Sequence, residues 1–421
     1  MPKTPSETSS LEEWLRWQEA LHPQAIALGL DRIRPVAQKL GLPARGIRTI
    51  TLAGTNGKGS STALLSEIYL AAGYRTGSYT SPHLLRYNER VAIAGEPVSD
   101  DELCRAFAAV ERARGEIPLT YFEFGTLAAL WLFREAQVQL QLLEVGMGGR
   151  LDAVNLVDAD CALITNIGLD HREFLGADRE KIGYEKAGVL RRGQAAVCVD
   201  PQPPASIGRE AGRVGARLWQ LGRDFSHGIA ADAWHWQGPG QRYKKLPPPG
   251  LQGAVQYRNA AGALAAVTAM QKLLPVPESA IRAGLVRLQL PGRFERRGPG
   301  GKIVLDVAHN VEAAQVLAEN LRAANISGNI RVVLGMLSDK PVAEFCAVLA
   351  GVARSFYLGG LPGPRGLSGA ELAKRAGVSA RVFETVGEAF RQARADIGVN
   401  DTIVACGSFL TVAAVEGLLD E

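Results

Sequence analysis

A buried strand that leads into a glycine-rich turn and then a helix is the feature that most restricts how this chain can fold. Residues 51–65 read TLAGTNGKGSSTALL, an apolar run followed by glycines and helix-forming residues. Such a turn presents backbone N–H groups to a phosphate at the positive end of a helix dipole, and Lys58 and Ser60 would add a cation and a Mg²⁺ ligand. A standard nucleotide-binding turn places the hydroxyl directly after the lysine, whereas Gly59 intervenes here. A plain glycine turn is the alternative.

From residue 47 onward, apolar strands alternate with amphipathic helices, which predicts an α/β fold with a largely parallel sheet covered on both faces. Ser99 and Glu102 predict a capping box for a helix that ends near Arg114, and a second helix is expected at 123–136. Proline- and glycine-rich segments bound residues 200–250, which we expect to be an irregular peripheral insert with short, possibly β, pieces. The strands are expected at 47–53, 75–80, 138–145, 161–167 and 194–199.

The segment QLPGRFERRGPGG at residues 289–301 breaks the helices that precede it and predicts a domain boundary. Strands and helices then alternate again, which predicts a second and smaller α/β domain. We therefore expect two domains, at 1–291 and 292–421. The strands of the second are expected at 302–307, 329–334, 354–358, 380–384 and 402–406.

Length and composition restrict the class of protein. A chain of 421 residues is too long for one ordinary core, in agreement with two or three domains. Lys and Arg total 47 against 43 Asp and Glu, an excess too small to predict a nucleic-acid surface. The five cysteines form no CxxC pair, which favours buried thiols in a reducing cytosol and no zinc site. No targeting or membrane-spanning segment and no long heptad pattern is evident, so we expect a cytoplasmic monomer.

Polar residues follow several of the expected strands. Ligands of open α/β sheets bind beyond the carboxyl ends of the strands. Ser81, Glu144 and the pair Asp170 and His171 occupy such positions, and with Ser60 they offer ligands suited to Mg²⁺. Glu144 is the strongest candidate, because a carboxylate that closes an apolar strand is costly unless a cation or hydrogen-bond donors compensate it. A helix cap or turn acceptor is the alternative for Glu144.

Three charged residues near this edge raise separate questions. The glycine-rich segment GMGGRLD places Arg150 and Asp152 within reach of a bound ligand. Lys186 is expected on a short helix that starts at Asp178, and a solvent-facing lysine is its plain interpretation. Beside a metal ion, a protonated amine at about 4 Å would cost about 4 kcal/mol per unit charge at an effective dielectric of about 20. Lys186 would then be neutral, turned away or chemically modified.

The second domain repeats the pattern. LDVAHN ends an apolar strand with Asp306, His309 and Asn310. Arg293 lies in the predicted boundary segment, where a linker salt bridge is one interpretation. The other is a guanidinium that moves over a triphosphate when the domains close.

At this point the motifs resemble a known family. GTNGKGS, YTSPHL, TYFEFGTL, LEVGMGGRLDAVN, LDH, EKAGV, LPGRFE, DVAHN and CGSF occur in the order found in the bifunctional dihydrofolate synthase/folylpolyglutamate synthases, which are relatives of the Mur ligases. The resemblance covers essentially the whole chain. The phosphate turn and hinge are shared with all Mur ligases, whereas SPHL and YFE look like the folate branch.

The resemblance implies a P-loop Mur-ligase-type ATPase domain that binds ATP and pteroate, followed by a Rossmann-like glutamate-ligase domain. It implies an ATP-dependent amide ligase that adds L-glutamate to 7,8-dihydropteroate and to tetrahydrofolates through an acyl phosphate. Its other partners would be these small molecules and two Mg²⁺ ions, with no nucleic acid and no membrane.

The same resemblance implies roles for individual residues. Nucleotide contacts fall on Asn56, Gly57, Lys58, Gly59, Ser60, Asn259, Arg293 and Asp306, and magnesium ligands on Ser60, Ser81, Glu144 and His171. Pteroate-binding segments fall on Ile26, Ala27, Leu28 and Gly29, on Thr120, Tyr121, Phe122 and Glu123, and on Leu151, Asp152 and Ala153. Catalytic roles fall on Lys58, His309 and Lys186. By likeness Lys186 is carbamylated, which would turn a cation into an anion able to bind Mg²⁺.

The residues, taken without the family resemblance, are compatible with three other functions. A Mur-type ligase acting on a cell-wall precursor is the rival from the same superfamily. A P-loop switch or phosphotransferase is disfavoured by Gly59 and by the lack of an Asn-Lys-x-Asp motif. A nucleotide-binding regulatory module without turnover is the third alternative.

Overall fold

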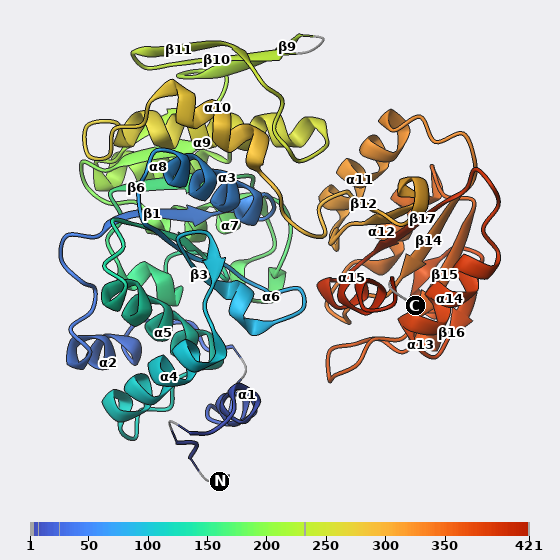
Figure 1. The fold of residues 1–421 in the computed structure, drawn as a ribbon, viewed down its shortest axis with the longest axis horizontal. Coiled ribbons are helices and arrows are strands. Elements are labelled where there is room, and N and C mark those ends of the chain that lie inside the picture. The colour runs from blue at the N-terminus through green and yellow to red at the C-terminus, as the bar shows by residue number, and fades with distance from the viewer. Residues whose placement is uncertain (1–3, 7, 25, 231–232, 420–421) are drawn as a thin grey trace. The chain divides into compact units, whose positions relative to one another are not determined.

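The computed structural model describes residues 4–6, 8–24, 26–230 and 233–419 (Figure 1). The chain divides into two compact units. One consists of Met1–Gly250 with Tyr257–Leu288, and the other of Leu251–Gln256 with Gln289–Glu421. No helix within the described ranges combines the length and the apolar character needed to cross a bilayer.

The first unit contains an eight-stranded sheet in the order β4-β3-β2-β5-β1-β6-β7-β8. Strands β2, β5, β1, β6, β7 and β8 are parallel, and β3 and β4 add an antiparallel edge. The expected α/β sheet and its five expected strands are confirmed, and each strand is one to three residues shorter in total than expected. The strands are β1 (Arg48–Ala53), β2 (Thr76–Tyr79), β3 (Val91–Ile93), β4 (Glu96–Pro97), β5 (Leu140–Glu144), β6 (Cys161–Ile164), β7 (Ala195–Cys198) and β8 (Arg217–Gln220).

Helices cover both faces of this sheet (Figure 1). One face packs against α1 (Leu11–Glu19), α2 (Ile33–Lys39), α4 (Asp100–Arg114), α5 (Tyr121–Glu135), α7 (Arg179–Lys186) and α8 (Ala205–Val214). The other is covered by α3 (Lys58–Ala71), α9 (Ala254–Met270) and α10 (Glu278–Arg287). Short α6 (Arg172–Leu175), η1 (Tyr87–Arg90), η2 (Ala153–Leu156) and η3 (Ala187–Val189) lie in the connections.

Local sequence explains where two of these helices begin. Ser99 and Glu102 form the expected capping box of α4, in which each side chain accepts a hydrogen bond from the other residue's backbone N–H. Thr120 and Glu123 form the same box for α5, so this helix begins two residues before the expected position. Burial of Glu123 is tolerated because its carboxylate accepts from the backbone N–H of Thr120 at 2.8 Å and pairs with Arg32 at 3.1 Å.

Residues 200–250 are not irregular as predicted, although the short β pieces considered there are confirmed as strands. Helix α8 and strand β8 belong to the main unit, and β9 (Ser226–Ala230), β10 (Ala233–Gly238) and β11 (Gln241–Leu246) form an antiparallel sheet. Trp234 and Trp236 lie on the same buried face of β10. The indole N–H of Trp236 donates to the Ala261 carbonyl oxygen of α9 at 3.0 Å. Pro239 and Gly240 form the turn between β10 and β11, and three prolines at 247–249 follow β11.

The second unit contains a six-stranded sheet in the order β12-β13-β17-β14-β15-β16, parallel except for the edge strand β12. All five expected strands are confirmed, and part of the expected break forms β12. The strands are β12 (Glu295–Arg297), β13 (Ile303–Leu305), β14 (Ile330–Leu334), β15 (Ser355–Gly359), β16 (Ala380–Phe383) and β17 (Thr402–Cys406). The helices are α11 (Val311–Ala323), α12 (Val342–Ala350), α13 (Gly369–Ala376), α14 (Val386–Ala395) and α15 (Phe409–Glu416), with η4 at Pro299–Gly301.

Candidate active site

The glycine-rich turn joins β1, at the centre of the main sheet, to the first residue of α3. Gly54 has φ +147° and Gly57 has φ +84°, conformations that side-chain-bearing residues rarely adopt. A Cβ atom would lie 1.7 Å from Thr165 Oγ1 at Gly54 and 2.7 Å from Asn259 Oδ1 at Gly57. The turn therefore requires glycine at both positions, and it brings Asn259 of α9 against the start of α3. A turn packed this closely at a 14-residue helix fits a phosphate.

Lys58 and Glu144 lie at the mouth of this turn. Nζ of Lys58 donates to the carbonyl oxygens of Gly54 at 3.1 Å and Thr55 at 3.2 Å, and it lies 3.8 Å from Glu144 Oε1. The backbone N–H of Ser81 donates to Glu144 Oε2 at 3.4 Å. Because Glu144 is buried, these contacts compensate its charge. Two of the expected magnesium ligands, Ser81 and Glu144, are thus neighbours beside the lysine of the turn.

Lys186 is buried, so the interpretation as a solvent-facing lysine is wrong. It closes α7, whose N-cap is Asp178 as expected, and its Nζ donates to the Gly54 carbonyl oxygen at 2.8 Å. Burial and, to a lesser extent, the charge of Lys58 lower the pKa of Lys186 to about 7, although the carboxylates of Asp170 and Asp152 act to raise it. A substantial fraction of this amine is neutral near pH 7, which is the form that reacts with CO₂.

The loop after β6 runs alongside the glycine-rich turn. Asn56 N–H donates to Asn166 Oδ1 at 2.7 Å, and Gly168 N–H donates to Thr55 Oγ1 at 2.9 Å. His171 follows in this loop, with φ +50°, as the N-cap of α6. Within the described part of the chain, no three His, Cys, Asp or Glu side chains form a metal-binding group. The four expected magnesium ligands would not form such a group, because two of them, Ser60 and Ser81, are serines.

Three segments expected to bind pteroate come together, although they are far apart in sequence. Gly29 N–H donates to the Leu151 carbonyl oxygen at 3.1 Å, which joins residues 26–29 to residues 151–153. Arg32, which sequence reasoning missed, lies 3.1 Å from Glu123 Oε1 and donates to the Ala27 carbonyl oxygen, so it ties residues 26–29 to residues 120–123. No local pattern marks Arg32, because its partner is 91 residues away.

Two further contacts link this region to the glycine-rich segment after β5. A Cβ atom at Gly146 would lie 2.7 Å from Phe122 Cζ, so Phe122 packs directly on that backbone. Asp152 is buried and accepts from the N–H groups of Met147 and Val154 at 2.8 and 3.0 Å. Burial raises the pKa of Asp152 to about 6, although those N–H groups and the charge of Lys58 act to lower it.

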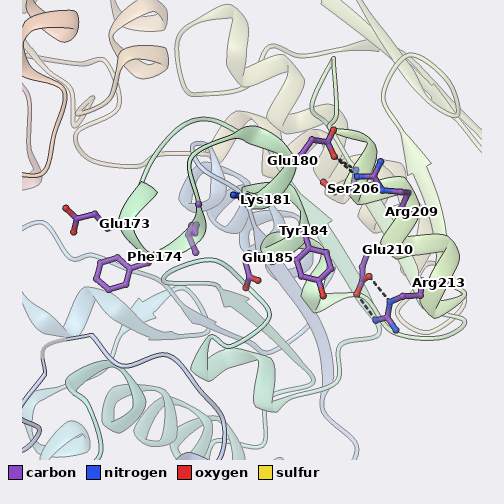
Figure 2. A pocket seen from close by; sticks show the side chains of 12 residues that line it. Glu173, Phe174, Glu180, Lys181, Tyr184, Glu185, Ser206, Arg209, Glu210 and Arg213 are labelled. Carbon is purple, nitrogen blue, oxygen red and sulfur yellow. Dashed lines mark hydrogen bonds and ion pairs between the residues drawn. The ribbon is translucent and has the colours of Figure 1, made fainter.

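Arg150 was expected to lie within reach of a ligand, but its side chain is engaged elsewhere. Its guanidinium lies over the ring of Tyr184, 4.0 Å from the centroid, and pairs with Glu210 at 2.8 Å. Figure 2 shows the neighbouring groove of about 720 Å³ that α6, α7 and α8 line. None of the expected site residues lines it. Two of its carboxylates are paired, Glu180 with Arg209 and Glu210 with Arg213, so it offers little net charge to an anionic substrate.

In the second unit, Arg293 and His309 lie beside Phe409, the first residue of α15, and their charges act on Asp306. Asp306 accepts from the N–H groups of Phe294 at 2.9 Å and Ala308 at 2.8 Å, and burial raises its pKa. The guanidinium of Arg293 lies 5.2 Å from the centroid of the Phe409 ring, and the His309 ring lies 6.3 Å from the same centroid. Phe409 was not singled out from the sequence. Asn310, by contrast, is the N-cap of α11, a structural role.

Comparisons with known proteins show the family to which this chain belongs. Residues 52–224 match the Mur ligase middle domain, and residues 292–409 match the Mur ligase glutamate ligase domain. The Escherichia coli K12 dihydrofolate synthase/folylpolyglutamate synthase is 43% identical over 418 residues, which cover 99% of this chain and 97% of that protein.

Two solved structures are similar throughout. The E. coli protein in complex with DHPP and ADP has a TM-score of 0.95 at 42% identity, with 99% of each chain covered. A bifunctional folylpolyglutamate synthase/dihydrofolate synthase with Mn, AMPPNP and L-glutamate bound has a TM-score of 0.93 at 46% identity, with 100% of each chain covered. With such identity along nearly its whole length, this chain belongs to the dihydrofolate synthase/folylpolyglutamate synthase family of the Mur ligases.

Proposed function

We propose that this protein is an ATP-dependent ligase that adds L-glutamate to 7,8-dihydropteroate and to tetrahydrofolates. The observation that carries the proposal is the arrangement around one turn. Lys58 and Lys186 both donate to the Gly54 carbonyl oxygen, Glu144 lies beside Lys58, and the charge of Lys58 acts on Asp152 of the expected pteroate segment. The relatives' names and their bound ADP, AMPPNP and L-glutamate support the same activity.

The phosphate turn would hold the triphosphate through Asn56, Gly57, Lys58, Gly59 and Ser60, with Asn259 behind it. Ser60, Ser81, Glu144 and His171 would hold two Mg²⁺ ions, and the Mn in a related structure supports a divalent metal here. When bound, these ions reduce the repulsion between an anionic carboxylate and an anionic phosphate. Lys58 adds a fixed positive charge to the same place, where transition-state charge develops.

The reaction has two steps. A carboxylate oxygen of the pteroate or folate attacks the γ-phosphorus, and ADP leaves as the acyl phosphate forms. The glutamate amine then attacks the acyl carbon, phosphate leaves, and the nitrogen loses its proton to give the amide. Water must be excluded until the amine arrives, which favours a chain of two domains over one rigid pocket.

We assign ATP and pteroate binding to domain 1–291 and the glutamate-ligase role to domain 292–421. Arg293 and Asp306 would contact the nucleotide, and His309 would act beside them. Thr120 to Glu123, Leu151 to Ala153 and Ile26 to Gly29 would bind the pteridine. All five cysteines are free and buried, in keeping with a cytoplasmic protein, and a monomer is our assignment for the oligomeric state.

Lys186 would act as a carbamate. Its neutral nitrogen would attack the carbon of CO₂ and lose a proton, and the resulting anion would bind Mg²⁺. The support is that Lys186 is buried within 2.8 Å of the phosphate turn, where a permanent cation would repel the metal.

The test is a product analysis. Purified protein with ATP, Mg²⁺, L-glutamate and dihydropteroate should form ADP and dihydrofolate in equal amounts, and tetrahydrofolate should gain further glutamates. ATP turnover that is indifferent to every folate, or that depends on a cell-wall precursor, would rule the proposal out.

A further inference from the structure

Arg90 is held in one orientation by three side chains. It closes η1, and its Nε–H donates to Nδ1 of His83 at 2.8 Å. Its guanidinium carbon lies 5.3 Å from the centroid of the Tyr87 ring and 5.6 Å from that of Tyr121. The two tyrosine rings meet edge to face at 5.7 Å, so they form one aromatic surface for the cation.

The charge of Arg90 has no acidic partner among the described residues. The adjacent Glu89 is engaged by the backbone N–H groups of residues 84–86, at 2.6 to 2.8 Å. The Nη atoms of Arg90 make no hydrogen bond within the part of the chain that the structure describes. A partly buried guanidinium in this state has lost hydration without gaining an anion. Its free Nη fork matches the two oxygens of a carboxylate.

The position of Arg90 indicates whose carboxylate this is. Thr80 N–H donates to the Arg90 carbonyl oxygen at 2.9 Å, so Arg90 flanks the loop that carries Ser81. On its other side, Tyr121 belongs to the expected pteroate segment. Arg90 therefore lies between the segment assigned to the pteroate and the loop assigned to the metal, where the carboxyl end of the substrate would extend.

The reacting carboxylate is a poor match for this arginine, because a bidentate pair would occupy the lone pairs needed to attack phosphorus. A folate that already carries a glutamyl residue has a second carboxylate, on the α-carbon, which does not react. We propose that Arg90, positioned by His83, binds this α-carboxylate and so favours folylglutamates, which have it, over dihydropteroate, which lacks it. This inference rests on the proposed function.

The first experiment compares two acceptors in the Arg90→Gln variant at saturating ATP, Mg²⁺ and L-glutamate. We expect the ratio of kcat/KM for tetrahydrofolate to kcat/KM for dihydropteroate to fall about tenfold to a hundredfold, the range of charge-assisted hydrogen bonds. Arg86→Gln is the matched control, because Arg86 is exposed on the same loop and pairs with Asp100. An unchanged ratio in Arg90→Gln overturns the proposal. So does a higher KM for free glutamate with both acceptors, which would assign Arg90 to the incoming amino acid.

The second experiment does not depend on how the variant folds. Wild-type protein is assayed with tetrahydrofolate and with the α-carboxamide of tetrahydrofolate, in which a neutral amide replaces only the α-carboxylate. We expect the amide to be the poorer acceptor by a similar factor, and Arg90→Gln to use the two about equally. Equal use by the unmodified protein overturns the proposal. If the unmodified protein glutamylates neither tetrahydrofolate nor dihydropteroate, the proposed function itself has failed.

The role of His83 is tested by the same acceptor ratio. His83→Asn keeps an acceptor for the Arg90 Nε–H, whereas His83→Leu does not. We expect His83→Leu to lower the ratio and His83→Asn to restore most of it. Equal ratios in the two variants would show that His83 does not position Arg90.

Discussion

At the scale of single residues, the site contains close contacts that a substitution would disrupt. Gly57 combines a left-handed backbone with direct contact to Asn259, and Lys186 places a buried amine on the Gly54 carbonyl oxygen. Both are short-range effects at the same turn. Each one predicts the result of a substitution.

Gly57→Ala should weaken nucleotide binding more than it weakens folding. The added Cβ would meet Asn259 Oδ1 at 2.7 Å in a backbone with φ +84°, at a cost of about 1–3 kcal/mol. Gly73→Ala is the matched control, because Gly73 has φ +88° and nothing within 4 Å of an added Cβ. Urea unfolding should show a loss of stability in both variants, and calorimetric titration with ADP and Mg²⁺ should show weaker binding in Gly57→Ala alone. Equal ADP affinity in the two variants would contradict this.

Lys186 should carry CO₂. Mass spectrometry of native protein in bicarbonate buffer should detect the adduct on the peptide that contains Lys186. Lys186→Ala should lose most activity, since no anion replaces the carbamate, and acetate should restore part of it. Lys181→Ala is the control, because Lys181 is an exposed lysine on the same helix. An absent adduct together with failed rescue would leave Lys186 as a buried hydrogen-bond donor only.

At the scale of elements, a charged group beside the start of one strand ties that strand to its neighbour. In the second unit, Asp401 lies just before β17 and accepts from Asn329 N–H at 2.8 Å and Gly398 N–H at 3.0 Å, and it pairs with Arg331 of β14 at 2.8 Å. Burial alone would raise the pKa of Asp401, but these donors outweigh it and lower the pKa to about 2.

The folded state should therefore lose stability in acid. Because the pKa of Asp401 is lower in the folded chain than the value of about 3.9 for a free aspartate, its contribution is complete above about pH 4 and is lost as the pH falls toward 2. Asp401→Asn should be less stable at pH 7 and should show a flatter decline below pH 4 in urea titrations. Glu319→Gln, at an exposed position on α11, should behave like the unmodified protein. A decline of unchanged slope in Asp401→Asn would contradict this assignment.

At the scale of the whole molecule, the two units divide the labour that we propose. The residues assigned to pteroate belong to the first unit, whereas Arg293, Asp306 and His309 belong to the second. Binding of the acceptor and turnover should therefore respond separately to substitution.

Arg293→Ala should reduce kcat by about a hundredfold or more, as expected for removal of a charge that stabilises a transition state, while dihydropteroate binding persists. Arg296→Ala is the control, because Arg296 is exposed on the adjacent strand β12. Steady-state kinetics and equilibrium binding of dihydropteroate check the two parts. Loss of dihydropteroate binding in Arg293→Ala would contradict the separation.

The sequence by itself determined the order of most strands and helices along the chain, the glycine-rich turn and the two α/β sheets. These features depend on hydrophobic periodicity, helix caps and glycine conformations, which act over a few residues. It suggested short β pieces at 200–250 but not the regular sheet of β9 to β11, which depends on buried tryptophans and packing on α9.

Only the tertiary structure decided how each charged side chain is used. It buried Lys186, paired Arg150 with Glu210, tied Arg32 to Glu123 and placed Arg90 between two tyrosines. The physical reason is that desolvation and Coulomb interactions depend on which groups are close in space, and many of these neighbours come from segments tens of residues apart.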